Sequence, residues 1–115
     1  MSSRTPKLFL DDIQKAISKI ELYIKGLTFE QFQEDLKTVD AVIRNLEIIG
    51  EAVKNLPSDI ITKNPNVNWR GATAMRDRLI HGYFGIDISI LWETVTTDLP
   101  KLKKQIVKIW NGLNN

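Results

Sequence analysis

The apolar residues in the first quarter of the chain recur with the period of an α-helix. Successive members are three or four residues apart, which places them on one helix face: Leu10, Ile13, Ile17, Ile20 and Ile24. The pair Thr5-Pro6 predicts the start of this helix, because proline is tolerated in the first turn. Gly26 predicts its end.

A second helical region is predicted over residues 28–56. It opens with Thr28-x-x-Gln31, the pattern of a capping box, and stops before Pro57. Its apolar residues again keep helical spacing: Phe29, Phe32, Leu36, Val39, Val42, Ile43, Leu46, Ile49, Val53 and Leu56. The pattern is compatible with one bent helix or with two, of which the second would be capped by Asp35 or Thr38.

Gly50 interrupts the strongest of these apolar stripes. Glycine inside a helix costs about 1 kcal/mol relative to alanine, so its presence calls for a reason. We interpret it as the mark of a tight helix crossing. The alternative is that another group must approach the backbone closely beside Glu51.

The second half of the chain predicts further helices and no strand. Prolines and asparagines over residues 57–68 predict turns around a short helix at 58–63. A helix is expected from about Trp69 to Gly82, and a last one from Ile88 towards Gly112 with Asp87 as its N-cap. Pro100 is expected to kink or restart that helix, with Asp98 as the cap. We therefore predict one all-α domain over residues 1–115, a small bundle of about five helices.

The composition excludes several classes of chemistry. The chain has 115 residues, of which 43% are apolar, no cysteine and a single histidine, His81. Disulfides, a thiolate nucleophile and a zinc site built on sulfur are thereby excluded, as is a metal site of several histidines from one chain. Proton transfer near neutral pH must use His81, a shifted carboxylate or lysine, or groups of a partner.

The charges are unevenly distributed along the chain. The net charge is only +2, but residues 11–51 hold nine acids and five bases, whereas residues 63–108 hold eight bases and four acids. The basic half can meet a phosphate backbone or the protein's own acidic half. No apolar run approaches the roughly 20 residues of a membrane span, and the N-terminus lacks the pattern of a signal peptide. We expect a cytoplasmic protein.

The densest polar cluster is RDRLIHGY, residues 76–83. The His81 imidazole can take a proton from a ribose 2′-hydroxyl or return one to the leaving 5′-oxygen. The Arg76 guanidinium can hold a phosphate with two hydrogen bonds and balance the charge of the transition state. The Tyr83 phenol can stack on a base or donate to a phosphate. Each group therefore has a task in cleaving a phosphodiester.

Helix geometry limits how these groups act together. Asp77 and His81 are four residues apart and share a helix face, and Arg78 is also a neighbour of His81. Arg76 and His81 are five apart, about 140° around a helix, so they do not share a face. They converge only if the chain leaves helical geometry near Gly82, or if a second copy of the chain completes the site.

Two long stretches resemble the HepT-like branch of the HEPN superfamily. One is DAVIRNLEIIGEA, residues 40–52, and the other is WRGATAMRDRLIHGYFGID, residues 69–87, followed by Leu91-Trp92 and Asp98-Leu99-Pro100. The second contains the family pattern R-x-x-x-x-H-x-Y without departure at Arg76, His81 and Tyr83. The resemblance covers nearly the whole chain.

The resemblance implies a helical homodimer whose motif helices face each other. It also implies the toxin of a type II/VII-like toxin–antitoxin module, a metal-independent endoribonuclease that needs no cofactor and attacks RNA through the substrate's own 2′-hydroxyl. Arg76 and His81 would be the catalytic pair, with Asp77 as the supporting polar residue. The antitoxin would be a minimal nucleotidyltransferase (MntA-like) that inhibits the toxin by AMPylation of Tyr83.

Two other hypotheses stay open. The chain can be a non-catalytic helical adaptor or nucleotide-binding partner of a nucleotidyltransferase, or a structural protein in which Asp77 and His81 form a polar pair. We interpret Trp69 and Trp92 as packing residues. The lysines near the C-terminus form either a solvated face or a surface that guides RNA: Lys101, Lys103, Lys104 and Lys108.

Overall fold

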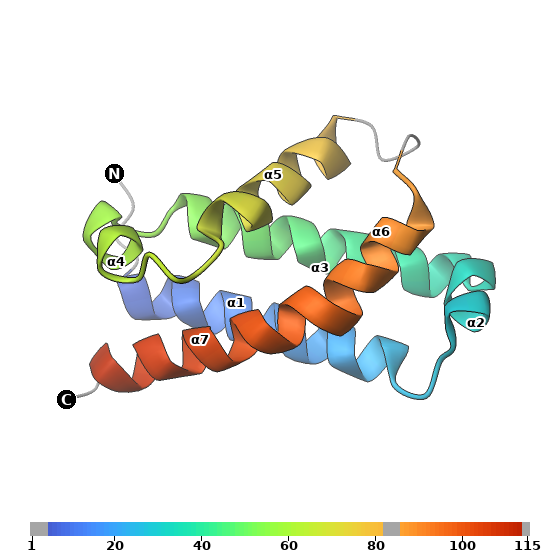
Figure 1. Ribbon diagram of the computed structural model, residues 1–115, viewed down its shortest axis with the longest axis horizontal. Helices are drawn as coiled ribbons and strands as arrows, with labels where there is room; N and C mark the ends of the chain where they lie inside the picture. The colour runs from blue at the N-terminus through green and yellow to red at the C-terminus, as the bar shows by residue number, and fades with distance from the viewer. Residues whose placement is uncertain (1–4, 82–85, 114–115) are drawn as a thin grey trace.

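The computed structural model describes residues 5–81 and 86–113, and these form helices connected by short turns (Figure 1). The elements follow the chain in this order: α1 (Pro6–Ile24), α2 (Phe29–Glu34), α3 (Leu36–Lys54), α4 (Ser58–Lys63), α5 (Trp69–Ile80), α6 (Ile88–Glu93), η2 (Thr94–Asp98) and α7 (Leu99–Leu113). No strand occurs in these residues. The predicted all-α class is confirmed.

The helix boundaries follow local capping chemistry. Thr28 Oγ1 accepts from the Gln31 N–H at 3.1 Å, and the Thr28 N–H donates to Gln31 Oε1 at 2.9 Å, which is a complete capping box. Asp35 lies between α2 and α3 and accepts from the backbone N–H of Thr38 at 3.1 Å. The region 28–56 is therefore two helices, and Asp35 is the cap. The Thr38 hydroxyl, and next its backbone N–H, hold the pKa of Asp35 below the usual 3.8.

The helix does not restart at Pro100 as predicted. The helical backbone runs without a break from α6 through η2 into α7, and Pro100 is the second residue of α7. Proline has no N–H to donate and crowds the carbonyl four residues earlier. The five π-helical residues of η2 widen the turn at this point. Asp98 lies inside this continuous helix, so the expectation that it caps a new one is wrong.

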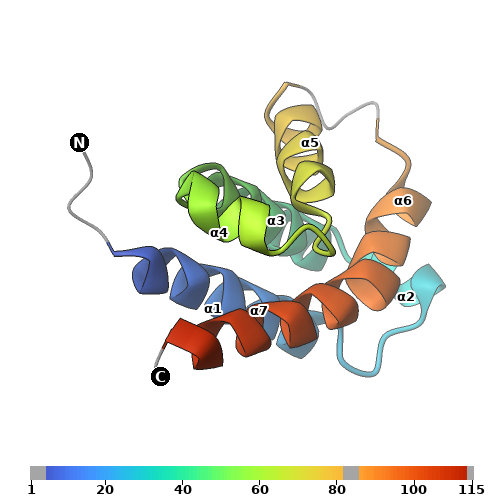
Figure 2. The same ribbon diagram turned by 60° about the vertical axis from the view of Figure 1, so that its left-hand side comes forward.

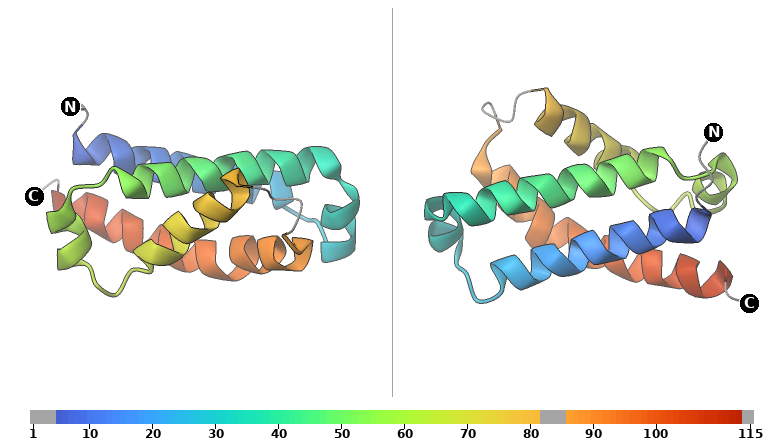
Figure 3. Two further views of the ribbon diagram at one scale, coloured as in Figure 1. Left: turned by 90° about the horizontal axis from the view of Figure 1, so that it is seen from above. Right: turned by 180° about the vertical axis from the view of Figure 1, so that it is seen from behind.

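The long helices pack on one another in layers. Figure 2 shows α1 and α7 side by side beneath α3, and Figure 3 shows α5 crossing α3 obliquely. Aliphatic residues of α1, α3 and α7 fill the centre and include the fully buried Ile13, Ile17, Ile49 and Ile106. Such burial stabilises the fold by about 1.5–3 kcal/mol for each large side chain.

Both tryptophans singled out in the sequence are packing residues, as predicted. Trp69 is 8% exposed, and its indole N–H donates to the Asn64 carbonyl at 3.0 Å. Trp92 packs against Phe32 with ring centroids 5.1 Å apart, and against Phe29 at 6.2 Å. These ring contacts attach α2 to α6 at one end of the bundle.

Gly50 lies where α3 and α5 cross. A Cβ placed on Gly50 would be 2.3 Å from the Cβ of Arg76 and 2.8 Å from the carbonyl oxygen of Ala72. Both distances are shorter than real Cβ contacts, so only glycine allows the two backbones to come this close. The interpretation of Gly50 as a tight crossing is confirmed, and the group that approaches is Arg76 itself. Among the described residues, no helix is long and apolar enough to cross a membrane.

Candidate active site

Arg76 is held between two carboxylates at the surface of the α3–α5 crossing. Its Nη2 lies 2.8 Å from Oε2 of Glu51 on α3, and its Nη1 lies 2.9 Å from Oδ1 of Asp77 on α5. The Arg76 side chain is 18% exposed, whereas the two carboxylate side chains are 54% and 59% exposed. The guanidinium is therefore fixed in direction while one side of the cluster faces solvent.

Glu51 and Asn55 are the members of this cluster that sequence reasoning did not assign. The Asn55 amide donates to Oε1 of Glu51 at 3.3 Å and to the Glu51 carbonyl at 2.8 Å. Glu51 thus offers one carboxylate oxygen to Asn55 and the other to Arg76. The available signal was Gly50, because a glycine that admits another residue's Cβ places its neighbour Glu51 beside that residue.

His81 is the C-cap that follows α5, and it is exposed. Its Nδ1 lies 2.8 Å from the Asp77 carbonyl oxygen, which also accepts the His81 backbone N–H at 3.1 Å. A carbonyl oxygen only accepts, so Nδ1 must carry a proton in this contact. In the neutral imidazole Nε2 then holds the lone pair and is the atom that can act as a base.

Asp77 is the residue that links the two halves of the motif. Its carboxylate binds Arg76 and its carbonyl binds the His81 ring. No hydrogen bond joins Arg76 and His81 directly within the described residues, as their spacing of five predicted. Tyr83 and Gly82 lie outside the described residues, so the expectations for them are not addressed by the structure.

Arg76 also borders a surface groove of about 480 Å³. The groove runs along α3 beside the end of α5, and its wall includes Arg44, Glu47 and Ile80 as well as Glu51. Ile80 is 48% exposed although it lies next to the buried Leu79. The guanidinium of Arg76 keeps one further buried donor, Nε, that has no hydrogen-bond partner among the described residues.

The charge asymmetry of the sequence is partly resolved within the fold. The pair Arg76–Glu51 and the pair Lys103–Glu21, which is 2.8 Å long, both join the basic second half to the acidic first half. Lys101, Lys104 and Lys108 stay exposed on α7. Within residues 5–81 and 86–113, no group of three or more His, Cys, Asp or Glu side chains is placed to hold a metal ion.

A family model described as ribonuclease HepT-like matches residues 13–109 of this chain. The chain belongs to the HepT-like ribonuclease family. It is 49% identical over 106 residues to "Probable ribonuclease HepT" of Thermococcus cleftensis, which covers 92% of this chain and 96% of that protein. It is also 46% identical over 109 residues to a protein of Methanocaldococcus jannaschii named as a candidate RNase, covering 95% and 90% of the two chains.

A third relative comes from Caldanaerobacter subterraneus and is likewise named as a candidate RNase. It is 42% identical over 106 residues, or 92% of this chain and 95% of that protein. No solved structure matches this chain significantly. The comparisons establish the HepT-like family and a ribonuclease role in general terms, and the site described above supplies the groups through which such a role can be argued.

Proposed function

We propose that this HepT-like protein is a metal-independent endoribonuclease in which Arg76 and His81 are the catalytic residues. In the proposed step, Nε2 of His81 removes the proton from a ribose 2′-hydroxyl. The 2′-oxygen attacks the adjacent phosphorus, the bond to the 5′-oxygen breaks, and the His81 imidazolium returns its proton to that oxygen. The products are a 2′,3′-cyclic phosphate and a 5′-hydroxyl. The observation that carries the proposal is that Asp77 binds both Arg76 and His81.

The Arg76 cluster must rearrange when it binds a phosphate. One guanidinium and two carboxylates carry a net charge of −1, which repels an anion. Glu51 is held by Asn55 as well as by Arg76, whereas Asp77 is the more exposed partner and has no second side-chain hydrogen bond among the described residues. Asp77 is therefore the carboxylate that yields to the phosphate, and Glu51 keeps Arg76 in place.

Cleavage of RNA by the purified protein in the presence of a chelator tests this mechanism. His81→Ala removes the only imidazole of the chain and is expected to abolish cleavage, and Arg76→Ala is expected to do the same. Arg78→Ala is the matched control, because Arg78 lies on the same turn, is exposed and makes no ion pair in the described structure. Full activity of His81→Ala would refute the assignment.

We propose in addition that two copies of the chain combine their sites. Arg76 and His81 point in different directions on one copy, and a two-fold dimer with facing α5 helices brings two of each to one cleft. The half-exposed Ile80 and the groove beside it, which carries both signs of charge, supply a self-complementary surface. Light scattering of Ile80→Glu is expected to show a monomer where the unmodified chain is a dimer. A dimeric Ile80→Glu would contradict this interface.

The regulation follows from the position of Tyr83 in the motif. We propose that this protein is the toxin of a toxin–antitoxin module and that an MntA-like nucleotidyltransferase adds AMP to Tyr83. A bulky anion two residues from His81 would block the cleft and compete with RNA for Arg76. Intact mass after incubation with the nucleotidyltransferase and ATP is expected to increase by one or more AMP units. An equal increase in Tyr83→Phe would place the modification elsewhere.

A non-catalytic adaptor for a nucleotidyltransferase is the second candidate function. The observation that favours it is the charge of Arg76, which is already balanced by Glu51 and Asp77, as in an arginine with a structural role. The cleavage assay separates the two candidates. An unmodified chain that binds the nucleotidyltransferase but never cleaves RNA would establish the adaptor.

A further inference from the structure

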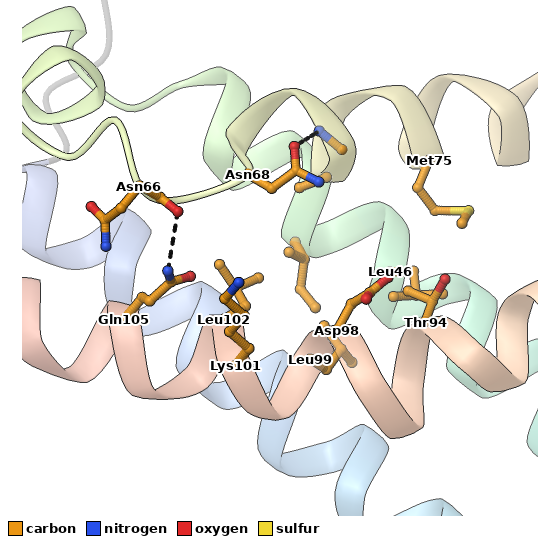
Figure 4. A pocket seen from close by; sticks show the side chains of 13 residues that line it. Leu46, Asn66, Asn68, Met75, Thr94, Asp98, Leu99, Lys101, Leu102 and Gln105 are labelled. Carbon is orange, nitrogen blue, oxygen red and sulfur yellow. Dashed lines mark hydrogen bonds between the residues drawn. The ribbon is translucent and has the colours of Figure 1, made fainter.

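A second cavity lies between α5 and α7 and is separate from Arg76 and His81 (Figure 4). Its volume is about 200 Å³, and it is lined by residues of α3, α5, η2, α7 and the loop before α5. Three residues of α5, the helix that carries the motif, line the cavity: Gly71, Ala72 and Met75, which is the neighbour of Arg76. We infer that this cavity binds one nucleotide through its base. The inference rests on the proposed function for the class of substrate, which is RNA.

The inner wall of the cavity suits the flat face of a base. It is formed by aliphatic side chains, Leu46 and Ile49 from α3 with Leu99 and Leu102 from α7, and Met75 faces them from α5 (Figure 4). An apolar slot of this kind excludes water from a ring while leaving its polar edge to be read at the rim. The volume of about 200 Å³ suits a single base, whereas drug-sized sites run to roughly 300–1,000 Å³.

Two amides at the rim are oriented by bonds of their own. Oδ1 of Asn68 accepts from the Gly71 N–H at 3.0 Å, which leaves the Nδ2 donor of Asn68 unused. Nε2 of Gln105 donates to the Asn66 carbonyl at 3.2 Å, which leaves the Oε1 acceptor of Gln105 unused. Figure 4 shows both unused atoms on the cavity side. The rim therefore offers one donor and one acceptor, and every base carries both on its Watson–Crick edge.

Gly71 permits this placement of the Asn68 amide. A Cβ at position 71 would lie 2.4 Å from Nδ2 of Asn68 and 2.8 Å from its Cγ, so any other residue would turn the amide away. Gly71 lies in the first turn of α5, where Asn68 is the N-cap. The amide position gives this second helical glycine a physical reason, as the crossing does for Gly50.

The charged groups of the rim complete the match to a nucleotide. Lys101 and Asp98 line the same wall, and they form no ion pair with each other or with another described residue. Figure 4 shows both side chains directed at the cavity. The Lys101 ammonium can bind the phosphate, and the Asp98 carboxylate can accept from the amino group of adenine, cytosine or guanine. A base without its phosphate would leave the Lys101 ammonium without a bound anion.

Titration of the full-length protein with AMP, CMP, GMP, UMP and ribose 5-phosphate tests the site, read by NMR from the side-chain amide signals. At least one nucleotide is expected to bind and to shift the Gln105 signal, and ribose 5-phosphate, which has no base, is expected to bind more weakly. Lys101→Ala and Gln105→Leu should each weaken nucleotide binding by about fivefold or more. Lys104→Ala is the matched control, an exposed lysine of α7 that does not line the cavity.

Each other outcome overturns the inference. Absence of binding at millimolar nucleotide excludes the site, equal binding of ribose 5-phosphate excludes recognition of the base, and binding that neither variant weakens places it elsewhere. Urea unfolding of Gln105→Leu checks that its loss of binding is not a loss of fold. His81→Ala should bind nucleotide as the unmodified chain does but cleave no RNA, so failure of this inference and failure of the proposed cleavage are told apart.

Discussion

Replacement of Gly50 by alanine tests how closely the α3–α5 crossing controls the site. In an open helix this change stabilises by about 1 kcal/mol, because alanine has the higher helix propensity. Here the added Cβ would lie 2.3 Å from the Cβ of Arg76 and 2.8 Å from the Ala72 carbonyl oxygen. Neither neighbour can rotate away, since one is backbone and the other is attached directly to it. The helices must separate by about 1 Å to restore ordinary contact.

The expected result is a net loss of stability and of activity. Overpacking of this kind costs about 1–3 kcal/mol, so the balance is a destabilisation of up to about 2 kcal/mol, or a fall in Tm of roughly 4–8 °C for each kcal/mol. The same displacement moves Arg76 away from Glu51, whose contact is 2.8 Å, and cleavage of RNA should fall with it. Urea unfolding measures the first effect and a chelator-containing cleavage assay the second.

Gly112→Ala is the control for the propensity effect. Gly112 is also helical, and a Cβ there has no atom within 4 Å, so this variant should be as stable as the unmodified chain or slightly more so. If Gly50→Ala is stabilised like Gly112→Ala and keeps full activity, the crossing is not tight and the explanation of Gly50 is wrong.

Three further predictions follow from the same structure. Glu51→Gln should lower kcat for RNA cleavage by about tenfold or more without raising KM, because it loosens Arg76 while removing a charge that repels phosphate. Glu47→Gln, one turn earlier in the same groove, should change neither kcat nor KM, and equal effects of the two variants would refute the positioning role of Glu51. The lowered pKa of Asp35 means that its contribution to stability is present above pH 3.8 and is lost as the pH falls through the folded value, so Asp35→Asn should show a smaller loss of stability in urea unfolding between pH 5 and pH 2. Ile106→Ala should lower the free energy of unfolding by about 2–5 kcal/mol, since Ile106 is fully buried, and a loss under about 1 kcal/mol would show that the site can collapse around the gap.

The helices were predictable because their boundaries depend on residues within four positions of one another. The capping box of Thr28 and the N-cap at Asp87, which accepts from the Ser89 N–H at 2.9 Å, are local and were read directly from the residue order. The sequence did not decide whether Asp35 or Thr38 is the cap of α3, since both residues satisfy the pattern. The continuous helix through Pro100 could not be predicted either, because a widened π-helical turn leaves no mark in the spacing of apolar residues.

The candidate site shows the same division. Arg76, Asp77 and His81 were identified from one short motif, and helix geometry predicted that Arg76 and His81 would not meet on one face. The contact between Glu51 and Arg76 could not be predicted, because the two residues are far apart in the chain and meet only when α5 crosses α3. Gly50 was the one local sign of that crossing, since its cost to the helix required a reason from elsewhere in the fold.

The amino-acid sequence by itself thus determined the helices, the motif and the family, all of which depend on short-range pattern. The tertiary structure alone decided which carboxylate holds Arg76 and which amides and charges surround the cavity between α5 and α7. The physical reason is that these sites are built from side chains of separate helices. Their distances depend on how closely the helices pack, and packing is a property of the whole core.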